Sequence, residues 1–184
     1  MRSIVLFLFA ALGPLQASAA EHSLVLKPAS LQAVIESIGE AAPPLYQLRS
    51  RRAWIRLETP YVRLARAVAE ARQRDQPVGP RLGTPTVLAP VLRVIAGPET
   101  RGDADVKIEK VVAELPDGTS LEARIEERFT DLAQTRRRRG IKLVGVRAVL
   151  PLSALAPGVR FRVAIKGAPE ELIEPEPFWI EDVR

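Results

Sequence analysis

The sequence predicts a mainly β protein: an antiparallel β-sandwich over residues 86–184, preceded by a small helix-containing region over residues 20–85. Three observations support this fold class. After residue 86, apolar and polar residues alternate with a period of two in several short runs. Clusters of Pro, Gly and Asp separate these runs, as turns separate strands. Apolar residues make up 47% of the 184, which is enough to build a core.

Residues 1–19 have the order of parts of a secretory signal peptide. Arg2 supplies a positive charge, an uncharged apolar run follows, and Ala17-Ser18-Ala19 offers small residues to a signal peptidase. The alternative is a membrane anchor, but the run has about half the roughly 20 apolar residues that a spanning helix needs. We therefore expect cleavage after Ala19 or Ala20, a mature chain without a transmembrane segment, and a periplasmic or secreted location.

Two helices are expected in the N-terminal region. A short one is indicated by apolar residues at helical spacing, Leu31, Val34, Ile35 and Ile38. A longer one is predicted over residues 60–74, because Thr59 can cap its N-terminus and Pro60 suits the first helical position. Between them, residues 45–58 are expected to form one or two strands, and residues 75–86 are rich enough in Pro and Gly to form a loop.

The remaining strands are expected after residue 86, over residues 87–96, 106–115, 121–125, 141–150, 159–165 and 178–183. A slip in the phase of the alternation predicts a β-bulge near Glu109 and Lys110. Residues 116–119, Pro-Asp-Gly-Thr, have the composition of a hairpin turn. The four arginines and the glycine of residues 136–140 are expected to form a basic loop.

The segment over residues 152–163, Leu-Ser-Ala-Leu-Ala-Pro-Gly-Val-Arg-Phe-Arg-Val, is similar to a late-strand signature of fibronectin type III domains. In that signature a Leu and then Leu-x-Pro-Gly precede an aromatic residue that opens an alternating strand. Phe161 lacks the hydroxyl group of the tyrosine corner found in such domains. The resemblance covers these 12 residues and implies an immunoglobulin-like sandwich with a binding or spacing role. It assigns no site residue.

The composition excludes several kinds of chemistry. The chain has no Cys and one His, so thiol nucleophiles, cysteine-bound zinc, iron–sulfur clusters and disulfides are excluded. No nucleophile-elbow, P-loop or dinucleotide-binding motif is present. A hydrolase acting through paired carboxylates ranks last, since nothing marks two acids as buried. We therefore expect a protein that is not an enzyme and has no cofactor.

His22 supports a metal-binding alternative. After cleavage at Ala19 the chain would begin Ala20-Glu21-His22, whose amine, two backbone amides and imidazole can surround Cu(II) or Ni(II) in a square plane. Cleavage one residue later would remove this arrangement. A histidine without a ligand at a frayed terminus is the other interpretation.

The basic residues are unevenly distributed and suggest an anionic partner. The formal net charge is +5, and arginine far outnumbers lysine. One cluster surrounds Trp54 and contains Arg49, Arg51, Arg52 and Arg56; the other contains Arg136, Arg137, Arg138 and Arg139. Arginine binds phosphate and carboxylate in a bidentate manner. Given export, we expect a binding or structural module that contacts an envelope protein or an anionic polymer or lipid, and not nucleic acid. Solvated charge runs are the alternative.

Overall fold

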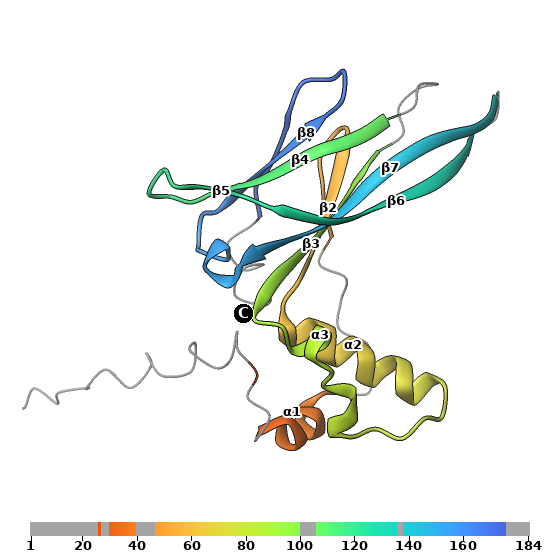
Figure 1. Cartoon of the computed structure of the whole chain (residues 1–184), viewed down its shortest axis with the longest axis vertical. Helices are drawn as coiled ribbons and strands as arrows, with labels where there is room; N and C mark the ends of the chain where they lie inside the picture. Colours follow the sequence, from red (N-terminus) through yellow and green to blue (C-terminus); the bar gives the residue numbers. More distant parts are fainter. Residues whose placement is uncertain (1–25, 27–29, 40–46, 100–105, 136–137, 176–184) are drawn as a thin grey trace, which may run out of the picture.

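The computed structural model describes Leu26 and residues 30–39, 47–99, 106–135 and 138–175. For residues 131–135 and 138–143 it describes the backbone alone. The described strands form one nine-stranded mixed sheet, and the helices gather beyond one end of it (Figure 1). The predicted signal peptide, with His22, and the predicted strand over residues 178–183 lie outside the described residues. In the described ranges, no helix is both long and apolar enough to cross a membrane.

The strands follow the order β1-β2-β3-β7-β4-β8-β9, with β5 paired to β4 and β6 paired to β7. Their bounds are β1 (Gln47–Arg49), β2 (Ala53–Glu58), β3 (Val91–Pro98), β4 (Val106–Glu114), β5 (Ser120–Glu122), β6 (Arg124–Thr135), β7 (Arg138–Pro151), β8 (Arg160–Ile165) and β9 (Glu171–Ile173).

The mainly β prediction is confirmed, but the antiparallel immunoglobulin-like sandwich is wrong. Strand β4 runs parallel to β7, with Val106 opposite Leu143, so the sheet is mixed. Strands β5 and β6 are separated only by Ala123 and pass from the edge of β4 to the edge of β7. The chain therefore passes directly from the strands around β4 to the strands around β7, and the two groups form one sheet. Alternation along a strand reports which face is buried and carries no information on the direction of its neighbour.

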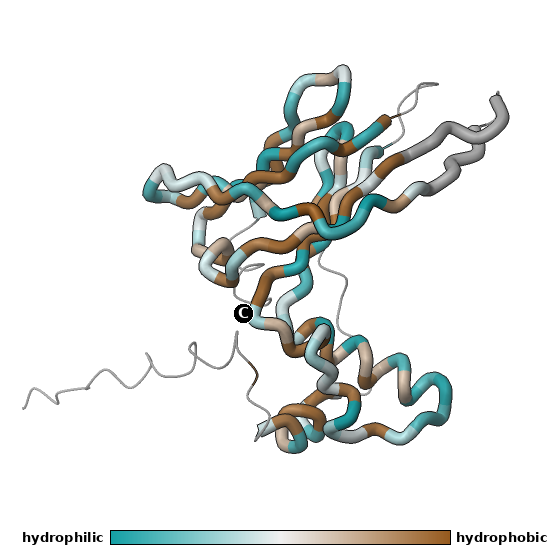
Figure 2. The backbone as a smooth tube through the Cα atoms, in the orientation of Figure 1, coloured by the Kyte–Doolittle hydropathy of each residue, from teal (hydrophilic) through white to brown (hydrophobic). Residues whose placement is uncertain are grey.

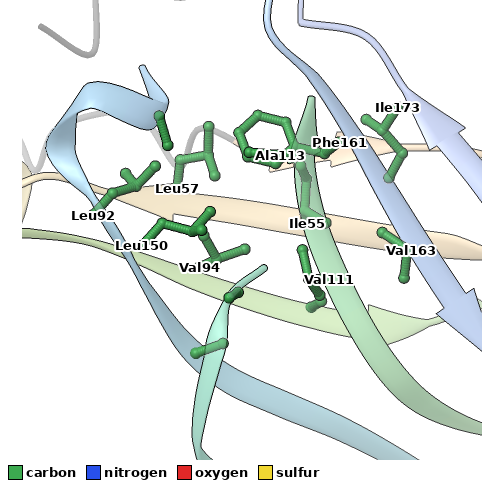
Figure 3. Close-up of a cluster of buried hydrophobic side chains, with 14 of the residues drawn as sticks. Ile55, Leu57, Leu92, Val94, Val111, Ala113, Leu150, Phe161, Val163 and Ile173 are labelled. Atoms are coloured by element: carbon green, nitrogen blue, oxygen red, sulfur yellow. The ribbon is translucent and has the colours of Figure 1, made fainter. Parts of the chain in front are cut away.

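The curved sheet encloses one apolar core. The inward residues of β2, β3, β4, β7 and β8 form a single buried cluster, and several are labelled in Figure 3. Phe161 is its largest fully buried side chain. At the two ends of the sheet, Arg52 after β1 lies 3.8 Å from Glu171 on β9, so the outermost strands approach each other. The result is a nearly closed, barrel-like sheet.

The helices form a second, smaller unit. They are α1 (Leu31–Ser37), α2 (Pro60–Gln73) and α3 (Pro85–Leu88), with short 3₁₀ turns η2 (Pro80–Leu82) beside them and η3 (Leu152–Ala154) after β7. Their apolar residues, including Ile35, Leu64 and Val68, form a buried cluster separate from the sheet core. Figure 2 shows the alternation of apolar and polar residues along both units. Residues 47–58, placed by sequence in the N-terminal region, belong to the sheet. The domain division itself stays a prediction.

Local expectations have mixed outcomes. The helix over residues 60–74 is confirmed, and the Thr59 hydroxyl accepts a hydrogen bond from the Val62 amide. The bulge is confirmed by a register shift between Ile108 and Lys110. The turn at residues 116–119 is also confirmed, with Gly118 at φ +86°.

Two local expectations are wrong. The strand predicted from residue 87 begins only at Val91, because Thr84 caps the short helix α3 and Pro85 starts it. The basic loop is shorter than predicted, since residues 138–140 already belong to β7.

Candidate anion-binding face

Alternate residues of β2 point to opposite sides of the sheet. Ile55 and Leu57 are fully buried in the core, so Trp54, Arg56 and Glu58 lie on the outer side. Residues directly opposite one another on paired strands share a face. This outer face is where the structure concentrates arginine side chains.

Neighbouring strands add further arginines to the outer face. Arg56 is opposite Ile95 on β3, which is in turn opposite Arg147 on β7. Glu58 is opposite Arg93. Because adjacent strands lie about 5 Å apart, Glu58 and Arg93 are direct neighbours, and Arg147 lies about 10 Å from Arg56, one strand further on.

Helix α2 starts directly after β2 and supplies one more arginine. Arg66 Nη1 donates a 2.5 Å hydrogen bond to Glu58 Oε1, and Arg56 Nε lies 3.2 Å from the same oxygen. Glu58 is only 5% exposed, and a buried charge is costly unless it is paired. These two guanidinium groups provide that pairing. We call Arg56, Arg93 and Arg147 on this face, with Arg66 on α2 beside it, the arginine cluster.

The cluster carries more positive charge than Glu58 can balance. Burial lowers the pKa of Arg56, Glu58 raises it, and the nearby charges of Arg66 and Arg147 lower it further. Arg147 has a partner of its own, since its guanidinium donates to Glu127 on β6. It also lies 5.6 Å from the centroid of the Phe129 ring, within cation–π range.

Arg63, also on α2, has a structural role. It is 6% exposed, and its guanidinium donates to four backbone carbonyl oxygens, those of Glu58, Val87, Ala89 and Val91. Burial and the neighbouring Arg93 lower its pKa to about 10, while Glu58 raises it, so Arg63 stays protonated at neutral pH. Arg63 therefore holds the start of α2 against the α3–β3 connection, and this fixes the wall of a cleft.

The cleft lies between α2 and the start of β3. It is an open hollow of about 230 Å³, lined by Glu58, Arg63, Arg66, Ala67, Glu70, Thr86, Val87 and Arg93. In the part of the chain that the structure describes, Arg93 forms no ion pair and no side-chain hydrogen bond, although it is half-buried. Its guanidinium is thus available to a carboxylate or phosphate that enters the cleft.

The first predicted arginine cluster is divided between different partners. Arg49 lies opposite Trp54, on the outer face, and pairs with Glu99 at 3.3 Å. Arg52 pairs with Glu171 on β9, and Arg51 is exposed in the turn between β1 and β2. Arg49 therefore shares a face with the arginine cluster, and Arg56, also in the predicted cluster, belongs to it.

The second predicted cluster is only partly described: it includes the first residues of β7, in the β6–β7 hairpin that extends away from the rest of the sheet (Figure 1). Arg136 and Arg137 lie outside the described residues, and Arg138 and Arg139 begin β7. His22 also lies outside the described residues. Among the residues that are described, no group of three or more His, Cys, Asp or Glu could hold a metal ion. All these site assignments stay predictions.

Arg66, Arg93 and Arg147 were not predicted as site residues from the sequence. Arg93 and Arg147 are single arginines inside predicted apolar strands, at positions that alternation places outside the core. From that alternation the sequence alone could place each arginine on the outer face of its own strand. Their proximity depends on the pairing of β3 with β7, which links distant parts of the sequence.

Comparisons with known proteins give no functional match. No protein-family model and no curated protein matches the chain. Among solved structures, the chain is similar to a protein from Burkholderia pseudomallei described as a novel protein of unknown function, at 12% identity and a TM-score of 0.36. The similarity covers 82% of this chain and 86% of that one.

Proposed function

We propose that the protein is an exported, non-catalytic binding module whose outer sheet face holds an anionic group of an envelope protein or polymer. The observation that carries this proposal is the arginine cluster: Arg56 and Arg66 share the buried Glu58 carboxylate, Arg147 lies on the same face, and Arg93 has no partner among the described residues.

The electrostatics support an anionic ligand. Guanidinium groups that are close together repel one another, most strongly where burial reduces the screening by water. A carboxylate or phosphate bound between Arg93 and Arg66 would relieve this repulsion and could accept hydrogen bonds from both. The planar fork of arginine suits such anions better than a lysine ammonium does.

The test compares two pairs of substitutions. Arg93→Gln with Arg147→Gln removes two charges from the face without removing the partners of Glu58. Arg74→Gln with Arg81→Gln removes two exposed charges elsewhere and serves as the control. We expect the first pair to weaken retention on phosphatidylglycerol vesicles or on acidic cell-wall preparations, and the control pair to leave it unchanged. Added salt should weaken retention of the wild-type protein. Equal retention of both variants would overturn the proposal.

A third variant locates the binding surface. Changing residues 136–139 from Arg to Gln tests the second predicted cluster, which the sequence marks as the alternative basic surface. If this variant loses retention while Arg93→Gln with Arg147→Gln keeps it, the ligand binds at that cluster and the assignment to the outer face is wrong.

A further inference from the structure

Two aromatic rings lie over glycines on the same outer face. The Trp54 indole covers Gly97 on β3, and a Cβ atom added there would overlap the ring. The Phe129 ring on β6 covers Gly145 on β7, where an added Cβ atom would overlap both the ring and the Ala96 carbonyl oxygen. Since β3 and β7 are paired neighbours, the rings lie above adjacent strands. We call Trp54 and Phe129, over these glycines, the aromatic shelf.

The φ angles do not explain these glycines, although at Gly145 the Ala96 carbonyl oxygen also leaves no room for a Cβ atom. Positive φ values among the described glycines occur at Gly118, Gly158 and Gly167, so Gly97 and Gly145 have conformations open to any residue. A glycine inside a strand weakens the sheet and often marks a close approach of a ligand or another group. Here the absence of a Cβ atom at each glycine lets an aromatic ring lie against the strand backbone, at a cost in sheet stability.

The shelf is bordered by arginines. Arg49 lies opposite Trp54, and the Arg147 guanidinium lies over the Phe129 ring, so Trp54 supplies the stacking surface and Phe129 positions Arg147 beside it. Arg56 is two residues along β2 from Trp54, which corresponds to about 7 Å and places both side chains on one face. Both rings are half-buried and keep part of their surface exposed. A ligand that rests on the shelf therefore has guanidinium groups beside it.

We propose that the aromatic shelf and the arginine cluster together bind an acidic saccharide; this deepens the function proposed above and rests on it. The C–H groups on one side of a sugar ring carry partial positive charge, and aromatic faces carry partial negative charge, so the two stack. A carboxylate on the stacked sugar would then reach Arg56 or Arg147. The shelf supplies contact area, and the arginines select for charge.

The geometry favours a saccharide over a membrane or an acidic peptide. Aromatic residues that anchor a protein in a bilayer insert among the lipid head groups, whereas these rings lie against the sheet. An acidic peptide would satisfy the arginines but has no flat apolar face to cover the rings.

The test uses two acidic probes of equal length, an oligogalacturonate and an oligoglutamate, with binding to the full chain measured by calorimetry. We expect tighter binding of the oligogalacturonate. Trp54→Ala should weaken that binding about tenfold, in line with stacking on a single aromatic residue, and leave the oligoglutamate affinity unchanged. Leu172→Ala, which shortens a 46% exposed apolar residue on β9, is the matched control and should change neither.

A second measurement does not depend on the stability of Trp54→Ala. The chain has two tryptophans, so Trp179→Phe leaves Trp54 as the only indole. Stacking of a sugar on Trp54 should shift the fluorescence emission of Trp54 when oligogalacturonate is added. Addition of oligoglutamate should leave that emission unchanged.

Three results would overturn the inference: equal affinity for both probes, absence of an emission change, or stronger binding of phosphatidylglycerol vesicles than of the oligogalacturonate. Each leaves the anion-binding proposal standing, provided that Arg93→Gln with Arg147→Gln weakens binding of the acidic probes. If those arginine changes have no effect, the proposed function itself fails.

Discussion

The two faces of strand β2 differ in what they contribute to the protein. Inward, Ile55 and Leu57 are fully buried in the sheet core. Outward, Trp54, Arg56 and Glu58 lie on the surface that carries the aromatic shelf and the arginine cluster. Folding depends mainly on the inner set through buried apolar area. The outer set is partly free of that constraint, so substitutions on the two faces should have separable effects.

The largest effect is expected from shortening an inner residue. Leu57→Ala removes buried apolar atoms and leaves a cavity, so the free energy of unfolding should fall by about 2–5 kcal/mol in urea denaturation. Leu57→Met, which keeps the volume, should cost less than about 1.5 kcal/mol. A loss below 1 kcal/mol for Leu57→Ala would mean that this face is not the main source of stability.

A substitution at Arg63 tests whether this buried charged residue contributes to the free energy of unfolding as an apolar core residue does. Arg63→Met removes hydrogen bonds to four carbonyl oxygens and should lower the free energy of unfolding by about 2–3 kcal/mol. Arg74→Met, on an exposed position of the same helical region, should change it by less than about 0.5 kcal/mol. Similar values for the two variants would contradict the structural role of Arg63.

A smaller effect on the free energy of unfolding is expected at Gly97, which lies under the Trp54 ring. Gly97→Ala places a Cβ atom against the Trp54 indole, which must shift, so we expect a loss of about 1–3 kcal/mol. The contacts at Gly97 come from the Trp54 side chain, so the same change in a Trp54→Ala background should cost much less. Additive losses in this double-mutant cycle would show that the ring does not cover the glycine.

The smallest effect is expected at Arg147. Its ion pair with Glu127 joins two exposed side chains, and such pairs contribute little. Arg147→Gln should therefore change the free energy of unfolding by less than about 0.5 kcal/mol, measured by the same denaturation. A large loss would place Arg147 among the residues that hold the fold together and weaken its assignment to binding.

The sequence predicted local features better than their assembly. Thr59 and Pro60 mark the start of α2 because a hydroxyl cap and a fixed φ act within one helical turn. The bulge near Lys110 was visible because it shifts the alternation itself. The parallel pairing of β4 with β7 was not visible, since it joins Val106 to Leu143 across a long stretch of chain.

The same limit applies to the site. The run Arg49, Arg51 and Arg52 attracts attention because its members are adjacent in sequence, yet Arg49 and Arg52 pair with different glutamates. The arginine cluster draws on three separate strands and α2, so its members are isolated in the sequence. A basic cluster of this kind can be found only once the register of the sheet is known.

The course of the chain between β2 and β3 has a consequence for how the protein could be altered. Glu58 and Arg93 face each other on paired antiparallel strands, where a tight turn could join them. The chain instead makes a helical excursion over residues 59–90, between the end of β2 and the start of β3. The order of the strands does not require this insertion, so the sheet could in principle tolerate its exchange. The excursion adds six of the eight residues that line the cleft, which makes it the natural segment to graft, trim or vary when redesigning what the protein holds.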